Sequence, residues 1–399
     1  MEKISIIEKT AIGILSALVL WVCFFAHLGA IGFVGPDEPR YAEVAKEMAQ
    51  SGDWVTPRLY HQAWFEKPIL YYWGAAAGFR LHGSDEVAGR LPSALAALIA
   101  VLALAWLAWK IYGTATAVAV ILILPTTVAG LAFARAAGPD MLFSASLTIA
   151  MIFAGDELRH AGALCCRLEL SEANSRSAWL SLILFGAALG FAALAKGPAA
   201  VILAGGSIGI WALATGSWRP AFHLAHPAAI AAFCAVALPW YVICALRNPD
   251  FVRTFLFLHN IERYTTPVFQ HRQPFWFFAP VILLGLLPWI ALIAGAAREG
   301  ARTWREGQWR DSPGFFLACW AFFPFLFFSF SQSKLPGYIL PAILPLGLLL
   351  AIAIVRAMES GAAASRWMLE ITGILWVAAL ALPARKLLKS FPPYASDPL

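Results

Sequence analysis

Long apolar runs dominate the sequence and limit what the chain can fold into. About 20 apolar residues in a helix span the hydrocarbon core of a bilayer, whereas a water-soluble domain would leave much of this surface in water. We therefore predict an all-α polytopic membrane protein with about eleven transmembrane helices, of which the third is kinked at Pro125. The runs lie at residues 11–34, 91–109, 113–134, 140–155, 178–195, 198–214, 227–245, 276–297, 314–331, 336–356 and 367–383.

Composition excludes the main alternatives. Hydrophobic residues make up 60% of the 399 residues and charged residues 13%, which is about half the usual charged share of a soluble domain. The net charge of +6 comes from basic residues scattered between apolar runs, so we expect contact with anionic membrane lipid and no nucleic-acid partner. The six cysteines show no metal-binding spacing and no disulfide framework.

The distribution of basic residues predicts the orientation. The first run follows Lys3 and Lys9 and is longer than the core of a cleaved signal peptide, so it is expected to remain as a helix. Loops on its N-terminal side carry thirteen Lys and Arg residues and the short connections on the other side carry three, although loops 35–90 and 247–274 add ten there. The N-terminus is therefore predicted to be cytoplasmic, in one integral domain over residues 1–399 without a C-terminal soluble domain.

The charges that are unusual in a membrane protein all fall on the predicted outer side. Some, such as Lys196 and Lys334, stand directly against apolar sequence, where an ionised group needs a partner. We expect these residues to converge in a polar cavity that opens to lipid, which suits a substrate with a charged head and an apolar tail. They are Asp37, Glu38, Arg40, Glu66, Lys67, Arg135, Asp140, Lys196, His259, Arg263, His271, Arg272 and Lys334.

The segment from Gly35 to Ala49 has two interpretations. Asp37 or Glu38 could simply cap a helix, with the following charges in exposed ion pairs. Alternatively, Asp37 points into the cavity as a general base or as an anchor for a sugar or metal. In that case an interfacial helix with Val44 and Met48 on its lipid face would hold it there.

The other motifs also leave alternatives open. Glu66 and Lys67 could form a local ion pair at the start of a helix. Alternatively, the two residues have separate ligands: Lys67 binds a phosphate, and Glu66 binds sugar hydroxyls or a divalent cation. Asp140 could cap a helix, Lys196 stands at a helix break, and Lys334 with Tyr338 could belong to the interfacial belt. Basic and aromatic residues between Arg247 and Phe275 suit a phosphate beside a hydrophobic chain; the two histidines there, His259 and His271, give a weak metal signal.

Taken in order, these motifs resemble a known family, the aminoarabinose transferase branch of the protein-mannosyltransferase superfamily. The resemblance implies a C-type glycosyltransferase-like bundle of about eleven helices, with amphipathic interfacial helices in the first periplasmic loop, residues 35–90. It also implies a multi-pass protein of the bacterial inner membrane with a periplasmic active site. The motifs are DEPRY (37–41), SGDW (51–54), FEKP (65–68), Asp140, KG (196–197), ERY with QHRQPFW (262–276) and SKLPGYILP (333–341).

The resemblance assigns roles to individual residues. Those matched to catalytic positions are Asp37, Glu66, Lys67 and Asp140, and those matched to substrate-binding positions are Arg40, Tyr41, Lys196, Arg263, His271, Lys334 and Tyr338. A divalent metal of unidentified type is implied at Glu66 and His271. The sequence departs from the family at His259-Asn260, where aminoarabinose transferases tend to have Glu-His before an isoleucine.

The implied activity is transfer of a sugar from a polyprenyl-phosphate donor to lipid A, a glycan or a protein. Direct displacement would invert the anomeric centre, and we expect inversion, although a carboxylate nucleophile would retain it. Two other functions would require different sequence features. A transporter or flippase of a lipid-linked sugar would place charges near the bilayer midplane and broken helices in two halves. A non-catalytic assembly subunit would tolerate loss of all the outer charges.

Overall fold

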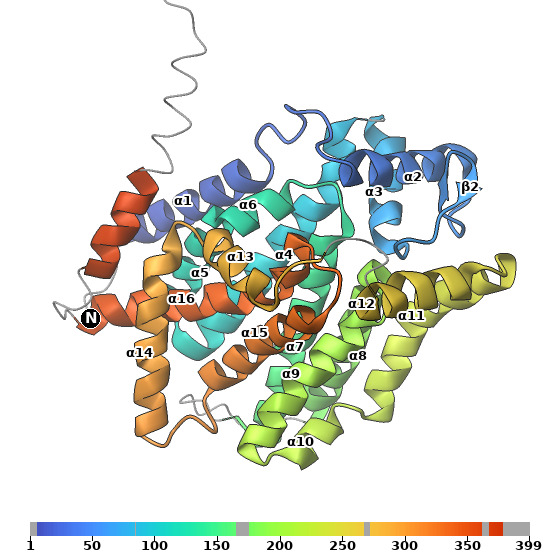
Figure 1. Cartoon of the computed structure of the whole chain (residues 1–399). Helices are drawn as coiled ribbons and strands as arrows, with labels where there is room; N and C mark the ends of the chain where they lie inside the picture. The colour runs from blue at the N-terminus through green and yellow to red at the C-terminus, as the bar shows by residue number, and fades with distance from the viewer. Residues whose placement is uncertain (1–5, 84, 165–174, 267–271, 361–366, 378–399) are drawn as a thin grey trace, which may run out of the picture.

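The computed structural model describes residues 6–83, 85–164, 175–266, 272–360 and 367–377. Within these ranges the chain is almost entirely helical, with one short antiparallel hairpin (Figure 1). The elements are α1 (Ile6–Phe24), α2 (Asp37–Ser51), β1 (Arg58–Leu59), β2 (Gln62–Ala63), α3 (Leu70–His82), α4 (Glu86–Tyr112), α5 (Thr114–Thr126), α6 (Val128–Ala134), α7 (Pro139–His160), α8 (Ser175–Lys196), α9 (Ala199–Thr215), α10 (Trp218–His223), α11 (Pro227–Arg247), the π-helix η1 (Arg253–Glu262), α12 (Arg263–Thr265), η2 (Phe275–Phe277), α13 (Phe278–Gly285), η3 (Trp289–Ala291), α14 (Leu292–Arg305), α15 (Pro313–Phe330), η4 (Pro336–Ile339), α16 (Leu340–Ser360) and a final helix over Trp367–Val377.

The described helices confirm an all-α polytopic membrane protein. Seven of them are long and apolar enough to cross a membrane, or up to nine if each of two bent helix pairs is one span. Two shorter apolar helices, α9 and Trp367–Val377, occupy the remaining predicted runs, and residues 378–383 lie outside the described part. The kink predicted at Pro125 is present: α5 and α6 are bent by 66° at Thr127.

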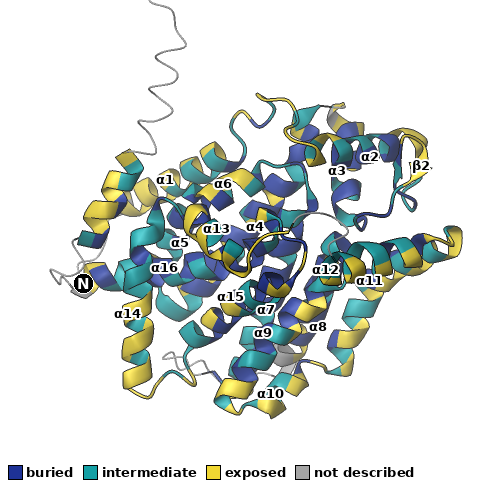
Figure 2. Cartoon of the chain, viewed as in Figure 1, coloured by how far each residue is buried: buried dark blue, intermediate teal, exposed yellow. Residues whose placement is uncertain are grey.

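The helices surround a buried centre. α7 packs against α4 on one side and α8 on the other, and most of its residues are buried (Figure 2). Exposed side chains are concentrated on outer helices such as α1, where they are large and apolar, as expected for a helix that faces lipid. α2, α3 and the β1–β2 hairpin lie together at one end of the bundle (Figure 1).

One predicted boundary is wrong. The first apolar run extends to Val34, but α1 ends at Phe24. The reason is Arg90, a buried residue near the start of α4, which donates hydrogen bonds to the carbonyls of Leu28 (3.0 Å), Ile31 (2.6 Å) and Gly32 (2.8 Å). These carbonyls are thereby held in a bent segment that leads to α2, instead of continuing a helix.

The same Arg90 fixes the start of α2 through Glu38. Its guanidinium lies 2.9 Å from a Glu38 carboxylate oxygen, and Glu38 also accepts hydrogen bonds from the backbone N–H groups of Val34 and Ala137, each at 2.7 Å. Three chain segments, around residues 30, 90 and 137, therefore meet on one carboxylate. Glu38 does not cap α2, whose N-cap residue Pro36 makes no side-chain capping bond.

Replacing Arg90 by alanine is expected to lower the free energy of unfolding by about 3 kcal/mol, because it leaves a buried Glu38 without its counter-ion. The measurement is thermal unfolding of the detergent-purified protein. Arg58→Ala is the matched control, since Arg58 is 40% exposed and its ion pair with Asp53 is 3.6 Å long; such a pair contributes about 0–1 kcal/mol. Equal losses in the two variants would contradict the role given to Arg90.

The predicted amphipathic helix α2 is present, but the prediction that its apolar face contacts lipid is wrong. Val44 and Met48 are buried against protein, not exposed to lipid, because α2 packs on α3 and β1. Tyr41 of the same helix contacts Tyr71 and Tyr72 of α3 in edge-to-face arrangements. The helix is thus a rigid support for Asp37 at its first position.

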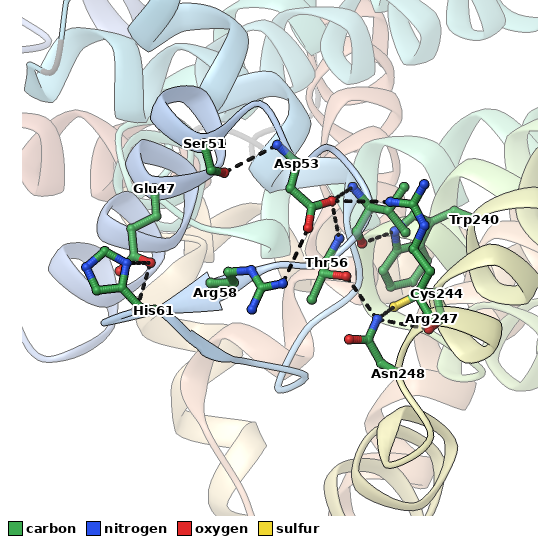
Figure 3. A network of polar contacts seen from close by, with 11 residues as sticks. Glu47, Ser51, Asp53, Thr56, Arg58, His61, Trp240, Cys244, Arg247 and Asn248 are labelled. Carbon is green, nitrogen blue, oxygen red and sulfur yellow. Dashed lines mark hydrogen bonds and ion pairs between the residues drawn. The ribbon is translucent and has the colours of Figure 1, made fainter.

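The segment between α2 and α3 is anchored to α11 by a polar network (Figure 3). Asp53 accepts hydrogen bonds from the N–H groups of Val55 and Thr56 and lies 3.6 Å from both Arg58 and Arg247. The indole of Trp240 donates to the Val55 carbonyl at 2.9 Å. The SGDW motif therefore fixes the chain that leads to residues 65–68, which carry Glu66 and Lys67.

Candidate active site

A polar cavity of about 270 Å³ lies where α2, α7, α8, α12 and η4 meet. Among its lining residues are eight of those predicted from the sequence, and they come from six separate segments of the chain: Asp37, Glu38, Tyr41, Lys67, Asp140, Lys196, Arg263 and Tyr338. Arg40 and Glu66 form ion pairs with residues of this lining. The predicted convergence of distant charges is therefore present.

Two helix ends place Asp140 and Lys196 face to face. α7 begins at Pro139, whose ring is suited to the first helical position, so Asp140 lies in the first turn. α8 ends at Lys196 because Gly197 adopts a left-handed conformation, with φ of 83°, and Pro198 follows. The Lys196 ammonium forms an ion pair with Asp140 and lies 4.7 Å from the ring centre of Tyr338. Asp140 does not cap α7, so the capping alternative is wrong.

Glu66 stands at the centre of a cluster of cations. Its carboxylate lies 3.1 Å from Arg40, 3.4 Å from Lys67 and 3.5 Å from Arg263, and its side chain is 8% exposed. Burial alone would raise the pKa of Glu66, but Lys67, Arg40 and Arg263 together hold it below its ordinary value. One buried carboxylate therefore holds three cationic groups together, and Lys67 and Arg263 also line the cavity.

Lys67 is the most perturbed of these cations. Burial lowers the pKa of its ammonium to about 8, although Glu66 opposes this change. An ammonium that is poorly solvated and only partly neutralised favours an incoming anion. The arrangement of Lys67 and Arg263 is suited to a phosphate group, because both cations reach the same cavity.

Asp37 is the accessible acid of the site. Its side chain is 52% exposed, and it forms an ion pair with Arg40, which in turn contacts Glu66. Arg40 also lies over the rings of Tyr41 and Trp64, at 5.4 Å and 5.8 Å from their centres. The guanidinium is thus held in place between aromatic rings and connects Asp37 to the cation cluster.

Several residues expected in the cavity are not among its described lining. Arg40 and Glu66 reach it only through ion pairs, and the others are Arg135, His259, His271, Arg272 and Lys334. The prediction for Lys334 is wrong in position: its buried ammonium donates to the carbonyls of Ser331 (2.5 Å) and Gln273 (3.1 Å). The Ser331 carbonyl directly follows the end of α15, where helix carbonyls attract a cation, and the neighbouring Leu335 lines the cavity instead. His271 lies outside the described residues.

Sequence reasoning missed the Glu38–Arg90 pair as the support of this site. Glu38 lines the cavity, as expected of the outer charges, but its only individual role in the sequence analysis was that of a helix cap. Arg90 carried a usable signal, because an arginine at the edge of an apolar run requires a buried partner. The sequence did not indicate which acid would be that partner.

The described surroundings of Glu66 do not fit a divalent cation. A metal ion at this carboxylate would face Arg40, Lys67 and Arg263 at close range. Within the described ranges, no group of three or more His, Cys, Asp or Glu side chains could hold a metal. The other implied ligand, His271, lies outside these ranges, so a divalent metal stays a prediction.

Comparisons with known proteins agree with the fold and show the family. Residues 10–255 match the profile of the family described as dolichyl-phosphate-mannose-protein mannosyltransferase. The undecaprenyl phosphate-alpha-4-amino-4-deoxy-L-arabinose arabinosyl transferase of Edwardsiella ictaluri is 35% identical over 319 residues, which cover 79% of this chain and 54% of that protein. The protein of the same name from Pseudomonas aeruginosa is 31% identical, with 82% and 56% covered. The chain thus spans about half the length of these curated relatives.

Solved structures show the same architecture. The crystal structure of ArnT from Cupriavidus metallidurans bound to undecaprenyl phosphate is 28% identical and superposes with a TM-score of 0.80, over 96% of this chain and 66% of that one. The archaeal oligosaccharyltransferase AglB from Archaeoglobus fulgidus, 13% identical with a TM-score of 0.57, covers 94% of this chain and 55% of its own. That second likeness shows the fold alone.

Proposed function

Because the chain belongs to the dolichyl-phosphate-mannose-protein mannosyltransferase family, we propose that it transfers a sugar from a polyprenyl-phosphate donor to an acceptor at the membrane surface. The observation that carries the proposal is the cavity in which Lys67 and Arg263 stand beside the accessible Asp37. Cations for a leaving phosphate and an acid for an acceptor are the two parts that such a transfer requires.

The phosphate is the leaving group of this reaction. Breaking the bond between the anomeric carbon and the phosphate oxygen develops positive charge on the sugar and additional negative charge on the phosphate. Lys67 and Arg263 stabilise that negative charge, because they are held in place by Glu66 before the reaction begins. Lys196, paired with Asp140, lines the cavity where Lys334 had been expected.

Asp37 acts on the acceptor. If the acceptor group is a hydroxyl, Asp37 orients it and removes its proton as it attacks the anomeric carbon. If the acceptor is itself a phosphate, no proton need be removed and Asp37 is a positioning group. Attack from the face opposite the leaving phosphate inverts the anomeric centre.

The pH dependence of transfer follows from Lys67. Its ammonium is charged below a pKa of about 8 and neutral above it, so phosphate stabilisation is lost as the pH rises through this value. We expect kcat/KM to fall by about tenfold per pH unit above pH 8, since this parameter reports groups of the free enzyme. In Lys67→Arg the charge persists to higher pH, so kcat/KM of the variant should no longer fall above pH 8. If kcat/KM of Lys67→Arg falls above pH 8 as it does in the wild type, Lys67 is not the group that causes this decrease.

The acceptor and the location are part of the proposal. The resemblance found in the sequence makes lipid A, a glycan or a protein on the periplasmic face of a bacterial inner membrane the acceptors to test. The name of the curated relatives makes 4-amino-4-deoxy-L-arabinose the first donor sugar to test. The end of the bundle that carries α2 and the cavity is proposed to be periplasmic, with the N-terminus in the cytoplasm.

The decisive experiment combines reconstitution with mass spectrometry. The purified protein in liposomes is given undecaprenyl-phosphate-linked sugars and candidate acceptors, and lipid A and envelope glycans from a deletion strain are compared with those of the parent. A missing aminopentose, hexose or uronic acid in the deletion strain is expected and names the donor class. No transfer with any donor and unchanged lipid A and envelope glycans would reject the proposal.

The rival function, transport of a lipid-linked sugar, fits the structure less well. It requires charges near the middle of the helices, whereas Asp140 stands at the start of α7 and Lys196 at the end of α8. Both belong to a cavity at one end of the bundle. The position of these charges favours chemistry at a membrane surface.

A further inference from the structure

A cluster of arginine and tryptophan side chains lies at the end of the bundle opposite the polar cavity. α15 shows this position, because it begins at Pro313 and ends at Phe330, shortly before Leu335 of the cavity lining. A helix of 18 residues is about 27 Å long, close to the thickness of the hydrocarbon core of a membrane. The cluster occupies the last turn of α14 and the connection to α15, and we refer to it as the arginine–tryptophan patch: Trp304, Arg305, Trp309 and Arg310.

The acids near the patch are engaged by other arginines. Glu299 of α14 forms ion pairs with Arg356 of α16 and with Arg302, and Glu306 pairs with Arg302 at 3.4 Å. Among the described side chains, no carboxylate, that of the neighbouring Asp311 included, forms an ion pair with either arginine of the patch. Both patch arginines are exposed. Their guanidinium groups are therefore accessible to an external anion.

The two tryptophans of the patch form a flat aromatic surface beside these charges. The rings of Trp304 and Trp309 are stacked, with centres 4.5 Å apart and planes inclined by 21°. Arg310 lies over the Trp309 ring, 5.4 Å from its centre, and Phe315 of α15 contacts Trp309 edge to face. Trp304 nevertheless remains 59% exposed. Exposed indoles next to the end of a membrane-spanning helix are typical of the membrane–water interface.

Stabilisation of α14 accounts for only part of the patch. Arg302 and Arg305 lie in the last turn of this helix, where cations interact favourably with the helix dipole. Arg310 lies beyond the end of the helix and gains nothing from that dipole. The dipole also gives no reason for an exposed pair of stacked indoles. The patch as a whole is better suited to a ligand that has both a negative charge and an apolar part.

We propose that the arginine–tryptophan patch binds the phosphate head groups of anionic phospholipids in the leaflet opposite the polar cavity. The guanidinium groups of Arg305 and Arg310 bind the phosphate oxygens, because a guanidinium presents paired N–H donors to them. The stacked indoles leave water and lie against the lipid below its phosphate. With the orientation proposed above, this is the cytoplasmic leaflet. The inference does not depend on sugar transfer, since the patch is remote from the polar cavity.

The proposal predicts a preference among phospholipids that differ only in head group. Phosphatidylglycerol carries a net negative charge, whereas the ammonium group of phosphatidylcholine cancels the charge of its phosphate. We therefore expect the patch to bind phosphatidylglycerol more tightly than phosphatidylcholine with the same acyl chains. The difference should shrink as the salt concentration rises, because salt screens charges at an exposed surface.

Lipid binding by charge variants tests the patch. The purified full-length protein is titrated with either phospholipid, and bound lipid is measured by native mass spectrometry. Arg305→Gln should weaken phosphatidylglycerol binding by about fivefold and Arg305→Gln/Arg310→Gln by about 25-fold, from the contribution of each arginine near an anionic surface. Binding of phosphatidylcholine should stay unchanged in both variants.

Arg219→Gln is the matched control. Arg219 is exposed on α10, which follows the end of α9 that is distant from the cavity, so this variant removes one charge on the same side of the membrane but outside the patch. Equal losses in Arg219→Gln and Arg305→Gln would show that binding follows total charge, and would overturn the inference. Equal affinity of the wild type for the two phospholipids would also overturn it.

A labelling experiment locates the bound lipid without requiring any variant to fold. Phosphatidylglycerol with a photoreactive head group should label wild-type residues between 302 and 313, and unlabelled phosphatidylglycerol should compete better than phosphatidylcholine. Labelling confined to other parts of the chain would contradict the proposal. Equal competition by the two phospholipids would identify the patch as an ordinary lipid contact and contradict it as well.

Discussion

Replacing Asp37 by asparagine is expected to reduce the rate of sugar transfer to a hydroxyl acceptor by about 100-fold or more. The amide keeps the size of the side chain and can still accept a hydrogen bond from Arg40, but it cannot take a proton. Proton transfer by a positioned acid or base contributes about 10²–10⁴ to a rate. The measurement is the initial rate with a fixed donor, at saturating donor concentration.

The variant should remain folded, because Asp37 is half-exposed and lies in the first turn of α2. Loss of one acid at a helix N-terminus costs about 0.3–1 kcal/mol. Glu43→Gln is the matched control, since it makes the same chemical change on the same helix, in an exposed pair with Lys46. If Asp37→Asn transfers sugar within about threefold of the Glu43→Gln rate, Asp37 does not have the proposed role.

Replacing Lys67 by methionine should have a comparable effect through the phosphate. Methionine keeps most of the length of the chain and removes the charge, so the departing phosphate loses one of its two fixed cations. Removal of one such group costs about 10²–10³ in rate. Binding of undecaprenyl phosphate, measured by displacement of a labelled donor, should weaken as well, because the cation also contacts the bound ground state.

The fold should tolerate this change, since Glu66 keeps its contacts with Arg40 at 3.1 Å and Arg263 at 3.5 Å. Lys46→Met is the control, because Lys46 is exposed on α2 and pairs only loosely with Glu43, at 4.0 Å. Donor affinity and rate that match those of this control would place the phosphate elsewhere in the cavity.

The two variants also test the mechanism together. Asp37 acts on the acceptor and Lys67 on the leaving group, so hydrolysis of the donor by water should respond differently to them. Lys67→Met is expected to slow hydrolysis and transfer alike, whereas Asp37→Asn should slow transfer more. The connection between the two groups runs through Arg40, which contacts Asp37 and Glu66.

Much of the fold could be predicted because hydropathy is a property of single segments. A run of apolar residues as long as 91–109 has few stable places other than a membrane, and the bend near Pro125 follows from the lost backbone hydrogen bond of a proline. The end of α1 could not be predicted in this way. The apolar run continues past Phe24, and its carbonyls are turned away from the helix by two arginines far along the chain, Arg90 and Arg135.

The sequence alone determined that charged residues from distant segments would gather, because an ionised side chain beside apolar sequence must find a partner or water. Only the tertiary structure decided which partners they found. Glu66 is held by three cations, Glu38 supports the loops through Arg90, and Lys334 turns to two carbonyls. The physical reason is that burial requires a charge to be neutralised, whereas the choice of neutralising group depends on distances between segments that lie far apart in the chain.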